Sequence, residues 1–313
     1  MQDSKVQIII LLSTYNGEKY LKEQLDSLSS QVSNNIKIIA RDDNSTDKTL
    51  EILKLYNIEI LKSQENSGAK KSFSALLEYA IKNNDSEYFM FCDQDDIWEK
   101  DKIEKTLKKM KEMENKYNNT PLLVHTDLKI VDEELNILNT SFWNHEFILP
   151  HYNAFNRLLM QNTITGCTMM INRKLAELSL PISKEAIMHD WWIGLVASRF
   201  GKIGYIEDST ILYRQHSNNT IGAKGFDYLS IFMKFYKIFY KNELYLKHLN
   251  VNINQAKSFV DTYRDSLDES TIQMLENFST IESKSFWQKR KILLKHKLLK
   301  QGFIRNIGLM VKI

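Results

Sequence analysis

The chain has 313 residues, of which 43% are hydrophobic and 26% are charged, and its formal net charge is +3. This length allows one large domain or two smaller ones with a sizeable buried core. No apolar run reaches the roughly 18 residues that span a bilayer, and the first residues carry no signal-peptide pattern, so we expect a cytoplasmic protein. The cysteines, Cys92 and Cys167, lie in apolar segments and are expected to be buried free thiols.

Strands and helices are predicted to alternate along the first 92 residues. Continuous apolar runs predict buried strands at 6–12, 36–40, 58–61 and 88–92. Between these runs, apolar residues recur at helical spacing. This alternation predicts a mostly parallel, Rossmann-like α/β sheet with helices on both faces.

The rest of the chain is predicted to be mixed at first and then helical. Strands are predicted at 122–125 and 167–171, and a helix at 191–200. After Gly225, the apolar residues of 228–246 lie on one helical face with lysines between them. Everything beyond this point is predicted to be helix.

Four polar clusters lie where predicted strands end, at 14–16, 42–43, 66–68 and 93–96. In a parallel α/β sheet the carboxyl ends of the strands meet at one edge, and ligands bind beyond that edge. We therefore expect these clusters to form one site.

The last of these clusters contains three carboxylates, those of Asp93, Asp95 and Asp96. Alternate side chains of a strand end point to the same side, so Asp93 and Asp95 should leave the sheet together. Close carboxylates repel one another unless a cation lies between them, and hard oxygen ligands suit Mg²⁺ or Mn²⁺. The alternative is a solvated loop before an acidic helix start.

The other clusters also have a structural and a binding interpretation. Asp42 and Asp43 could form a turn with a helix cap, or could accept hydrogen bonds from a nucleobase imide or a ribose hydroxyl. The segment 66–68, followed by Lys70 and Lys71, could be a plain helix entry or a phosphate site made of backbone amides and cations.

Two later motifs remain open on the residues alone. The run 188–192 (MHDWW) places a carboxylate and two aromatic residues at a helix start, and it could be an N-cap followed by core tryptophans. The run 213–220 (YRQHSNNT) offers a cation, an imidazole and amides together, and it could be a surface strand end.

Taken in order, 12–17 (LSTYNG), 42–47 (DDNSTD), Asn66-x-Gly68 and 93–96 (DQDD) resemble glycosyltransferase family 2 over roughly residues 6–220. That family has the GT-A fold and uses nucleotide-sugar donors. The resemblance implies that Asp93 faces the ribose or the metal, and that Asp95 ligates the metal that bridges the donor diphosphate. The residues expected to bind the donor are Thr14, Tyr15, Asn16, Asp42, Asp43, Asn66, Gly68, Lys71, Asp93, Gln94 and Arg214.

The resemblance also assigns roles to the later motifs. Asp190 is our choice as the general base, because a carboxylate can take the proton of an acceptor hydroxyl. His189 tunes Asp190 or contacts the acceptor, and His189 as the base is the alternative. His216 is expected to be a third metal ligand beside Asp93 and Asp95, and Arg214 to lie near the diphosphate. The residues expected to line the acceptor site are Gly166, His189, Trp191 and Trp192, although Gly166 could belong to a buried strand.

The motifs HDWW and YRQHSNN are similar to the rhamnosyltransferase-like branch of the family. That branch builds bacterial cell-surface polysaccharides and often uses dTDP-L-rhamnose. We therefore expect an inverting, metal-dependent transferase that acts on a lipid-linked saccharide. The alternatives are a UDP-hexose donor, a non-catalytic nucleotide- or glycan-binding protein, and a metal-dependent phosphoesterase.

The chain is predicted to divide into a catalytic domain at 1–225, with nucleotide-sugar binding at 1–125 and an acceptor part at 126–225, and a basic helical region at 226–313. From Lys284 onward there are nine Lys or Arg residues and no Asp or Glu, which indicates an anionic partner. This region could pack on the catalytic domain, form a homodimer contact or lie on an anionic membrane. We expect packing together with peripheral contact to the inner face of the plasma membrane. No base-reading motif suggests nucleic acid.

Overall fold

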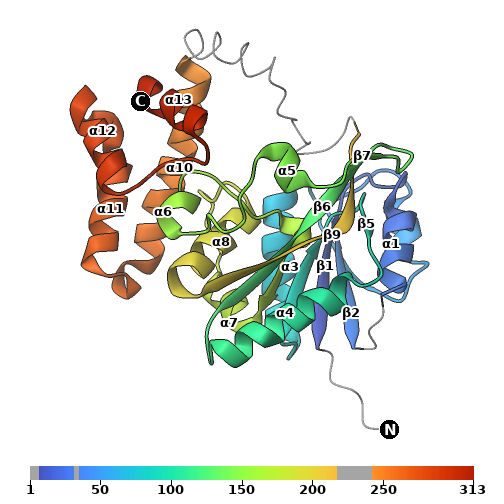
Figure 1. The fold of residues 1–313 in the computed structure, drawn as a ribbon. Helices are drawn as coiled ribbons and strands as arrows, with labels where there is room; N and C mark the ends of the chain where they lie inside the picture. The colour runs from blue at the N-terminus through green and yellow to red at the C-terminus, as the bar shows by residue number, and fades with distance from the viewer. Residues whose placement is uncertain (1–6, 32–34, 217–241) are drawn as a thin grey trace.

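The computed structural model describes residues 7–31, 35–216 and 242–313, with the backbone alone for 242–248. These residues form one nine-stranded sheet in the order β3-β2-β1-β4-β8-β6-β9-β5, with β7 paired to β6. Helices lie on both faces of the sheet, and a further group of helices stands beside it (Figure 1). The predicted α/β fold with a helical C-terminal extension is confirmed.

The strands are β1 (Ile8–Thr14), β2 (Ile36–Asp42), β3 (Glu59–Lys62), β4 (Tyr88–Cys92), β5 (Ile97–Trp98), β6 (Leu122–Val131), β7 (Ile137–Asn139), β8 (Met170–Asn172) and β9 (Lys202–Arg214). The helices are α1 (Leu21–Ser29), α2 (Thr49–Leu53), α3 (Ala69–Asn83), α4 (Lys102–Lys116), α5 (Phe142–Glu146), α6 (Phe155–Leu158), α7 (Arg173–Leu178), α8 (His189–Phe200), α10 (Asn242–Tyr263), α11 (Glu269–Ser279), α12 (Phe286–Lys295) and α13 (Phe303–Lys312).

The first four strands are parallel, and β1 lies between β2 and β4. Side chains of a strand alternate between its two faces. Ile9 and Leu11 therefore pack into the core under α3 and α8, while Ile8, Ile10 and Leu12 pack into a second core under α1 and α4. Because both faces are covered, every position of this strand favours an apolar residue, and this is why the run is continuous.

The second half of the sheet is mixed. β8 runs antiparallel to both β4 and β6, whereas β9 runs parallel to β6. The strand expected at 167–171 is shorter, because Gly166–Thr168 form a 3₁₀ turn, η1, before β8 begins at Met170. The hydroxyl of Thr168 donates to the carbonyl of Thr165 at 2.7 Å, a local bond that replaces strand pairing.

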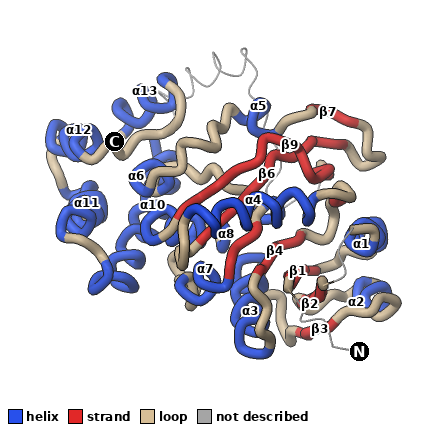
Figure 2. Tube along the Cα trace, turned by 60° about the horizontal axis from the view of Figure 1, so that its bottom comes forward, coloured by secondary structure: helices blue, strands red, loops and turns tan. Residues whose placement is uncertain are grey.

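The C-terminal helices pack against α6 and α8 at one end of the sheet (Figures 1 and 2). The ring of Phe259 in α10 lies 5.0 Å from the ring of Phe155 and 5.5 Å from that of Trp192. These rings belong to the same hydrophobic core as β1 and α3. The expected packing of the helical region on the catalytic part is therefore observed.

The predicted boundary near Gly225 and most of the apolar face at 228–246 lie outside the described residues. Within the part of the chain that is described, no helix has the length and apolar character needed to cross a bilayer.

Candidate active site

The acidic cluster follows the end of β4 at the carboxyl edge of the sheet. Carboxylate oxygens of Asp93 and Asp96 and the sulfur of Cys167 all lie within 4.8 Å of one another. Burial, together with the negative charges of Asp95 and Asp190, raises the pKa of Asp93 to about 7. Burial, together with the negative charges of Asp95 and Asp93, raises the pKa of Asp96 well above its ordinary value. The cluster therefore holds more negative charge than its surroundings neutralise.

Asp95 and His216 meet at this cluster. The Nε2 atom of His216 lies 2.9 Å from a carboxylate oxygen of Asp95, and its ring stands 4.9 Å from the ring of Tyr20. Carboxylate oxygens and an imidazole nitrogen are ligands that Mg²⁺ and Mn²⁺ accept, and a divalent cation would relieve the repulsion between Asp93 and Asp95. The pair of Asp95 and His216 is thus chemically suited to such an ion, and the predicted ligand set of Asp93, Asp95 and His216 stays a prediction.

Arg214 is buried beneath the same loop. Its guanidinium donates to the carboxylate of Glu23 and to the backbone carbonyls of Asp95 and Glu133, and it lies 4.5 Å from the centre of the Tyr20 ring. Its backbone N–H also donates to Asp96 at 3.3 Å. Arg214 therefore fastens the acidic loop to α1 and to the β6–β7 turn, and its expected contact with a diphosphate stays a prediction.

Asp190 lies in the first turn of α8, where its carboxylate accepts the N–H of Trp191 at 2.6 Å. Burial raises the pKa of Asp190 to about 6, although hydrogen bonds from the backbone of Trp191 and Gly166 partly oppose this shift. The group is close enough to Asp93 for its charge to raise the pKa of that residue. At neutral pH, Asp190 is thus an ionised carboxylate that is more basic than usual.

His189 is enclosed by aromatic rings. Its imidazole lies 4.2 Å from the ring of Phe73 and 5.1 Å from that of Phe91, and burial lowers its pKa to about 3. A Cβ atom on Gly166 would lie 2.8 Å from the Nε2 atom of His189, so a larger residue at that position of η1 would have to displace the imidazole. This environment supports Asp190 rather than His189 as the base.

The two tryptophans of the motif have different surroundings. Trp192 is fully buried against α10 and donates to the carbonyl of Ser179, so it is a core residue rather than a lining of the acceptor site. The reason is the packing of Phe259 and Tyr263 over its ring. Trp191 is partly exposed, and its indole donates to the carbonyl of Leu158 at 2.6 Å. Its expected contact with an acceptor stays a prediction.

The carboxylates of Asp42 and Asp43 bind the loops around them. Asp42 accepts the N–H and the hydroxyl of Ser45 at 3.0 and 2.5 Å. Asp43 accepts the N–H groups of Ser67 and Gly68 at 2.7 Å each. Both residues thus hold the loops at the rim of the sheet beyond β2. A nucleoside would have to bind through lone pairs of these carboxylates that the loop hydrogen bonds leave free.

The donor-binding residues expected at the end of β1 lie on the same rim. The side-chain amide of Gln94 accepts the N–H of Tyr15 at 2.8 Å and donates to its carbonyl at 3.0 Å. Asn16 has a positive φ of 46° and accepts the N–H of Thr46 at 2.9 Å. The buried hydroxyl of Thr14 donates to Asp42 at 3.3 Å. The acidic loop, the β1 end and the β2 end are therefore connected by hydrogen bonds.

The third expected cluster precedes α3. The side chain of Asn66 accepts the N–H of Gly68 at 3.0 Å. Gly68 has a φ of 81°, which glycine adopts without strain, and Lys71 is exposed in the first turn of α3. Hydrogen bonds from Ser67 and Gly68 to Asp43 join this cluster to the β2 end. The structure thus brings together three of the predicted polar strand ends and, through Gln94, the fourth.

The family model for glycosyl transferase family 2 matches residues 9–178 of this chain. The chain belongs to glycosyltransferase family 2. It is 32% identical over 224 residues to the dTDP-rhamnosyl transferase RfbG of Shigella flexneri, covering 68% of this chain and 74% of the relative. It is 28% identical over 215 residues to the putative teichuronic acid biosynthesis glycosyltransferase TuaG of Bacillus subtilis, covering 66% of this chain and 79% of the relative.

Two solved structures share the fold. One is the S. aureus TarS 1–349 fragment in complex with UDP-GlcNAc, with a TM-score of 0.53, 17% identity, and coverage of 93% of this chain and 80% of that one. The other is the mannosyltransferase PcManGT from Pyrobaculum calidifontis in complex with GDP-Man and Mn²⁺, with a TM-score of 0.52, 13% identity, and coverage of 99% and 79%. The expected GT-A fold is confirmed.

Two residues at the site of this family 2 transferase were not selected from the sequence. Tyr20 lies beneath both Arg214 and His216, but in the sequence it is one of several apolar positions of a helix. Lys102 is fully buried, donates to the carbonyl of Thr168 at 3.4 Å, and has a pKa that burial lowers to about 8. In the sequence, the feature that could have indicated its burial is its position on the same face of α4 as the buried residues Thr106 and Met110.

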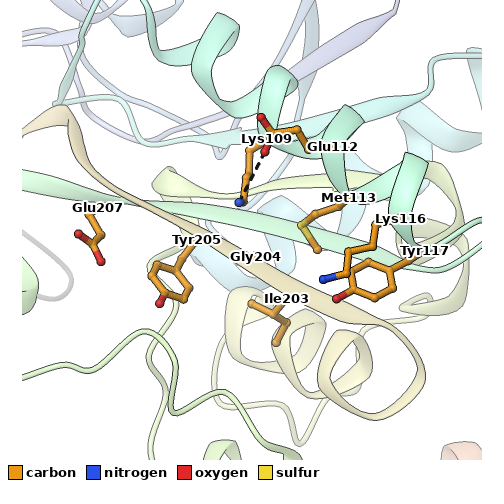
Figure 3. Close-up of a pocket in the computed structure, with 9 residues that line it drawn as sticks. All are labelled: Lys109, Glu112, Met113, Lys116, Tyr117, Ile203, Gly204, Tyr205 and Glu207. Atoms are coloured by element: carbon orange, nitrogen blue, oxygen red, sulfur yellow. Dashed lines mark ion pairs between the residues drawn. The ribbon is translucent and has the colours of Figure 1, made fainter.

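A hollow elsewhere on the transferase contains none of the predicted site residues. It has a volume of about 540 Å³ and is lined by residues of α4 and β9, with Gly204 of the strand next to Met113 of the helix (Figure 3). Lys109 and Glu112 form an ion pair at its edge. The acidic cluster, rather than this hollow, is the candidate active site.

Proposed function

We propose that this transferase moves L-rhamnose from dTDP-L-rhamnose, with inversion, onto a lipid-linked bacterial cell-surface polysaccharide in a reaction that needs a divalent cation. The observation that carries the proposal is the pairing of a basic carboxylate, Asp190, with the acidic cluster of Asp93 and Asp95. One group can accept a proton and the other can hold a cation beside a diphosphate.

The donor sugar is proposed from the relatives. The name of the Shigella flexneri relative supports dTDP-rhamnose, and that of the Bacillus subtilis relative supports a cell-wall polysaccharide as the product. A lipid-linked acceptor would place the enzyme at the inner face of the plasma membrane, as a cytoplasmic protein in peripheral contact with lipid.

Asp93, Asp95 and His216 are proposed to hold Mg²⁺ or Mn²⁺ through two carboxylates and one imidazole. When bound, the cation neutralises charge on the departing nucleoside diphosphate. Arg214 keeps the Asp95 carbonyl in place and so supports this arrangement. The residues proposed to bind the rest of the donor are Thr14, Tyr15, Asn16, Asp42, Asp43, Asn66, Gly68, Lys71 and Gln94.

Asp190 is proposed to take the proton of the acceptor hydroxyl as its oxygen attacks the anomeric carbon. The attack occurs from the face opposite the leaving diphosphate, so a single displacement inverts the anomeric centre. The proton ends on Asp190, and the bond to the departing diphosphate breaks as the new glycosidic bond forms. Gly166 and Trp191, which flank this carboxylate, are the proposed acceptor contacts.

The test is a transfer assay with purified protein and a synthetic lipid-linked rhamnosyl acceptor. dTDP-L-rhamnose and a panel of UDP- and GDP-sugars are offered with Mn²⁺ or with a chelator. Metal-dependent release of dTDP together with a glycosylated acceptor is the expected result. Release of UDP or GDP with a glycosylated acceptor would support the proposed transfer mechanism, but it would refute dTDP-L-rhamnose as the donor. Release of free phosphate or sugar phosphate would refute transfer in favour of a phosphoesterase.

A further inference from the structure

The outer face of α12 exposes several large apolar side chains. Trp287 is 77% exposed and Leu294 is 59% exposed, and Phe286 is exposed next to them. Trp287, Lys291 and Leu294 follow one another at spacings of four and three residues, so they lie on one face of the helix. The opposite face buries Leu293 in the core. An aromatic and a leucine on the outward face of a helix whose inner face is anchored in the core indicate a contact surface.

The same face is cationic. Lys291 and Lys295 are exposed, and neither forms an ion pair with any described residue. No acidic residue follows Glu282, so the chain beyond that residue offers no carboxylate side chain to neutralise them. This face would therefore attract an anionic surface along its whole length.

The neighbouring helix α13 also exposes apolar side chains. Its Phe303 is 80% exposed, and Val311 is exposed two turns farther along. The guanidinium of Arg290 in α12 donates to the carbonyl of Met310, which joins the two helices. The two helices are also held together before any partner binds, because Leu298 and Leu309 are buried in the shared core.

We propose that the outward face of α12, with Trp287, Lys291, Leu294 and Lys295, docks on the surface of an anionic lipid bilayer, with Phe303 of α13 extending the contact. The indole and the leucine enter the boundary between headgroups and acyl chains, and the lysines face the lipid phosphates. The helix lies in the plane of the interface and does not cross it.

The charge pattern favours lipid over a second copy of this chain. In a two-fold symmetric contact the same patch faces itself, so Lys291 and Lys295 would meet the same cations of the partner. No acidic side chain of α12 or α13 could relieve this repulsion. An anionic bilayer supplies both the apolar layer and the negative charge.

Docking through this face would also orient the enzyme. Arg305 of α13 donates to the carbonyls of Glu146 and Phe147 at the end of α5, at 2.8 and 3.3 Å. Asn156 donates to the carbonyls of His296 and Lys297 between the two helices. These bonds hold α12 and α13 to the catalytic part, so a bilayer-bound α12 would fix the direction in which the active-site rim faces.

The test is vesicle co-sedimentation of the full chain, which needs no sugar transfer and is independent of the proposed donor. The protein should bind vesicles containing 30–40 mol%, or roughly a third, of phosphatidylglycerol, and should bind pure phosphatidylcholine far more weakly. Raising the salt from about 0.05 to 0.5 M should release it, because screening shortens the range of the attraction.

Two variants probe the two parts of the contact. Trp287→Ser should weaken partitioning about tenfold, since a large apolar side chain no longer enters the interface. The double variant K291Q/K295Q should weaken it about 25-fold at low salt, or about fivefold for each lysine. Leu55→Ser, at a residue that is 79% exposed beyond α2, and K54Q/K108Q are matched controls that should bind like the parent.

Absence of binding to anionic vesicles by the parent chain would overturn the proposal. Equal binding by parent, Trp287→Ser and K291Q/K295Q would overturn it as well, because the contact would then lie elsewhere. Sedimentation equilibrium without lipid covers the remaining case. A dimer that Trp287→Ser converts to a monomer would assign this face to self-association and refute the lipid contact.

Discussion

Replacement of the proposed base, Asp190→Asn, separates proton transfer from binding. The carboxylate accepts the N–H of Trp191 at 2.6 Å, and an asparagine oxygen can accept the same bond. The fold and the donor affinity should therefore persist. The amide cannot take up the proton of the acceptor hydroxyl, so we expect kcat to fall about 10²- to 10⁴-fold.

The pH dependence of the parent enzyme follows from the environment of Asp190. Burial raises its pKa to about 6, and only the ionised carboxylate can accept a proton. At saturating Mn²⁺ and donor, kcat should be flat above this pH. It should fall about tenfold for each pH unit below it, since the ionised fraction falls by that factor. The residual activity of Asp190→Asn should lack this limb.

The assay is release of dTDP and formation of the glycosylated lipid at saturating substrates, with donor affinity measured by calorimetry. Asp85→Asn, at an exposed position between α3 and β4, is the matched control and should behave like the parent. Transfer by Asp190→Asn at the parent rate, or an unchanged acidic limb in that variant, would refute the assignment of the base.

The remaining predictions concern the supports of the site and of the fold. Arg214→Lys should raise the Mn²⁺ concentration for half-maximal transfer at least tenfold with donor KM unchanged, since lysine cannot reproduce the planar set of donors; a rise in donor KM alone would indicate a diphosphate contact instead. Asp43→Ala should raise donor KM and lower the free energy of unfolding by about 2–4 kcal/mol, because two loop amides lose their acceptor, and unchanged urea unfolding would contradict this. Gly201→Ala should cost about 1–3 kcal/mol in the same measurement, because its Cβ would lie 2.0 Å from the carbonyl oxygen of Pro121, and a parent-like midpoint would contradict the clash.

The sequence by itself determined the parallel half of the fold. A strand covered on both faces needs apolar residues at every position, so β1 and β4 appear as unbroken runs that no amphipathic element would produce. Because parallel strands end at one edge, the polar clusters after them had to converge. This geometry predicted one shared site, whereas the donor-binding roles of its residues came from the resemblance to family 2.

The tertiary structure alone decided which side chains of the later motifs face the site. His189, Asp190 and Trp192 begin the same helix, and their spacing is equally consistent with capping, catalysis or packing. Trp192 became a core residue because Phe259, from a helix much farther along the chain, covers its ring. Periodicity shows which face of an element is buried, but it does not show which element buries it.

Arg214 illustrates the same limit. From the sequence it is a cation at a strand end beside an imidazole, which is typical of phosphate binding. In the structure its guanidinium holds Glu23, 191 positions earlier, together with two carbonyls from separate loops. Such a contact depends on how the two halves of the sheet curl toward each other. Local sequence propensity does not predict which residues, far apart in the chain, this curling brings together.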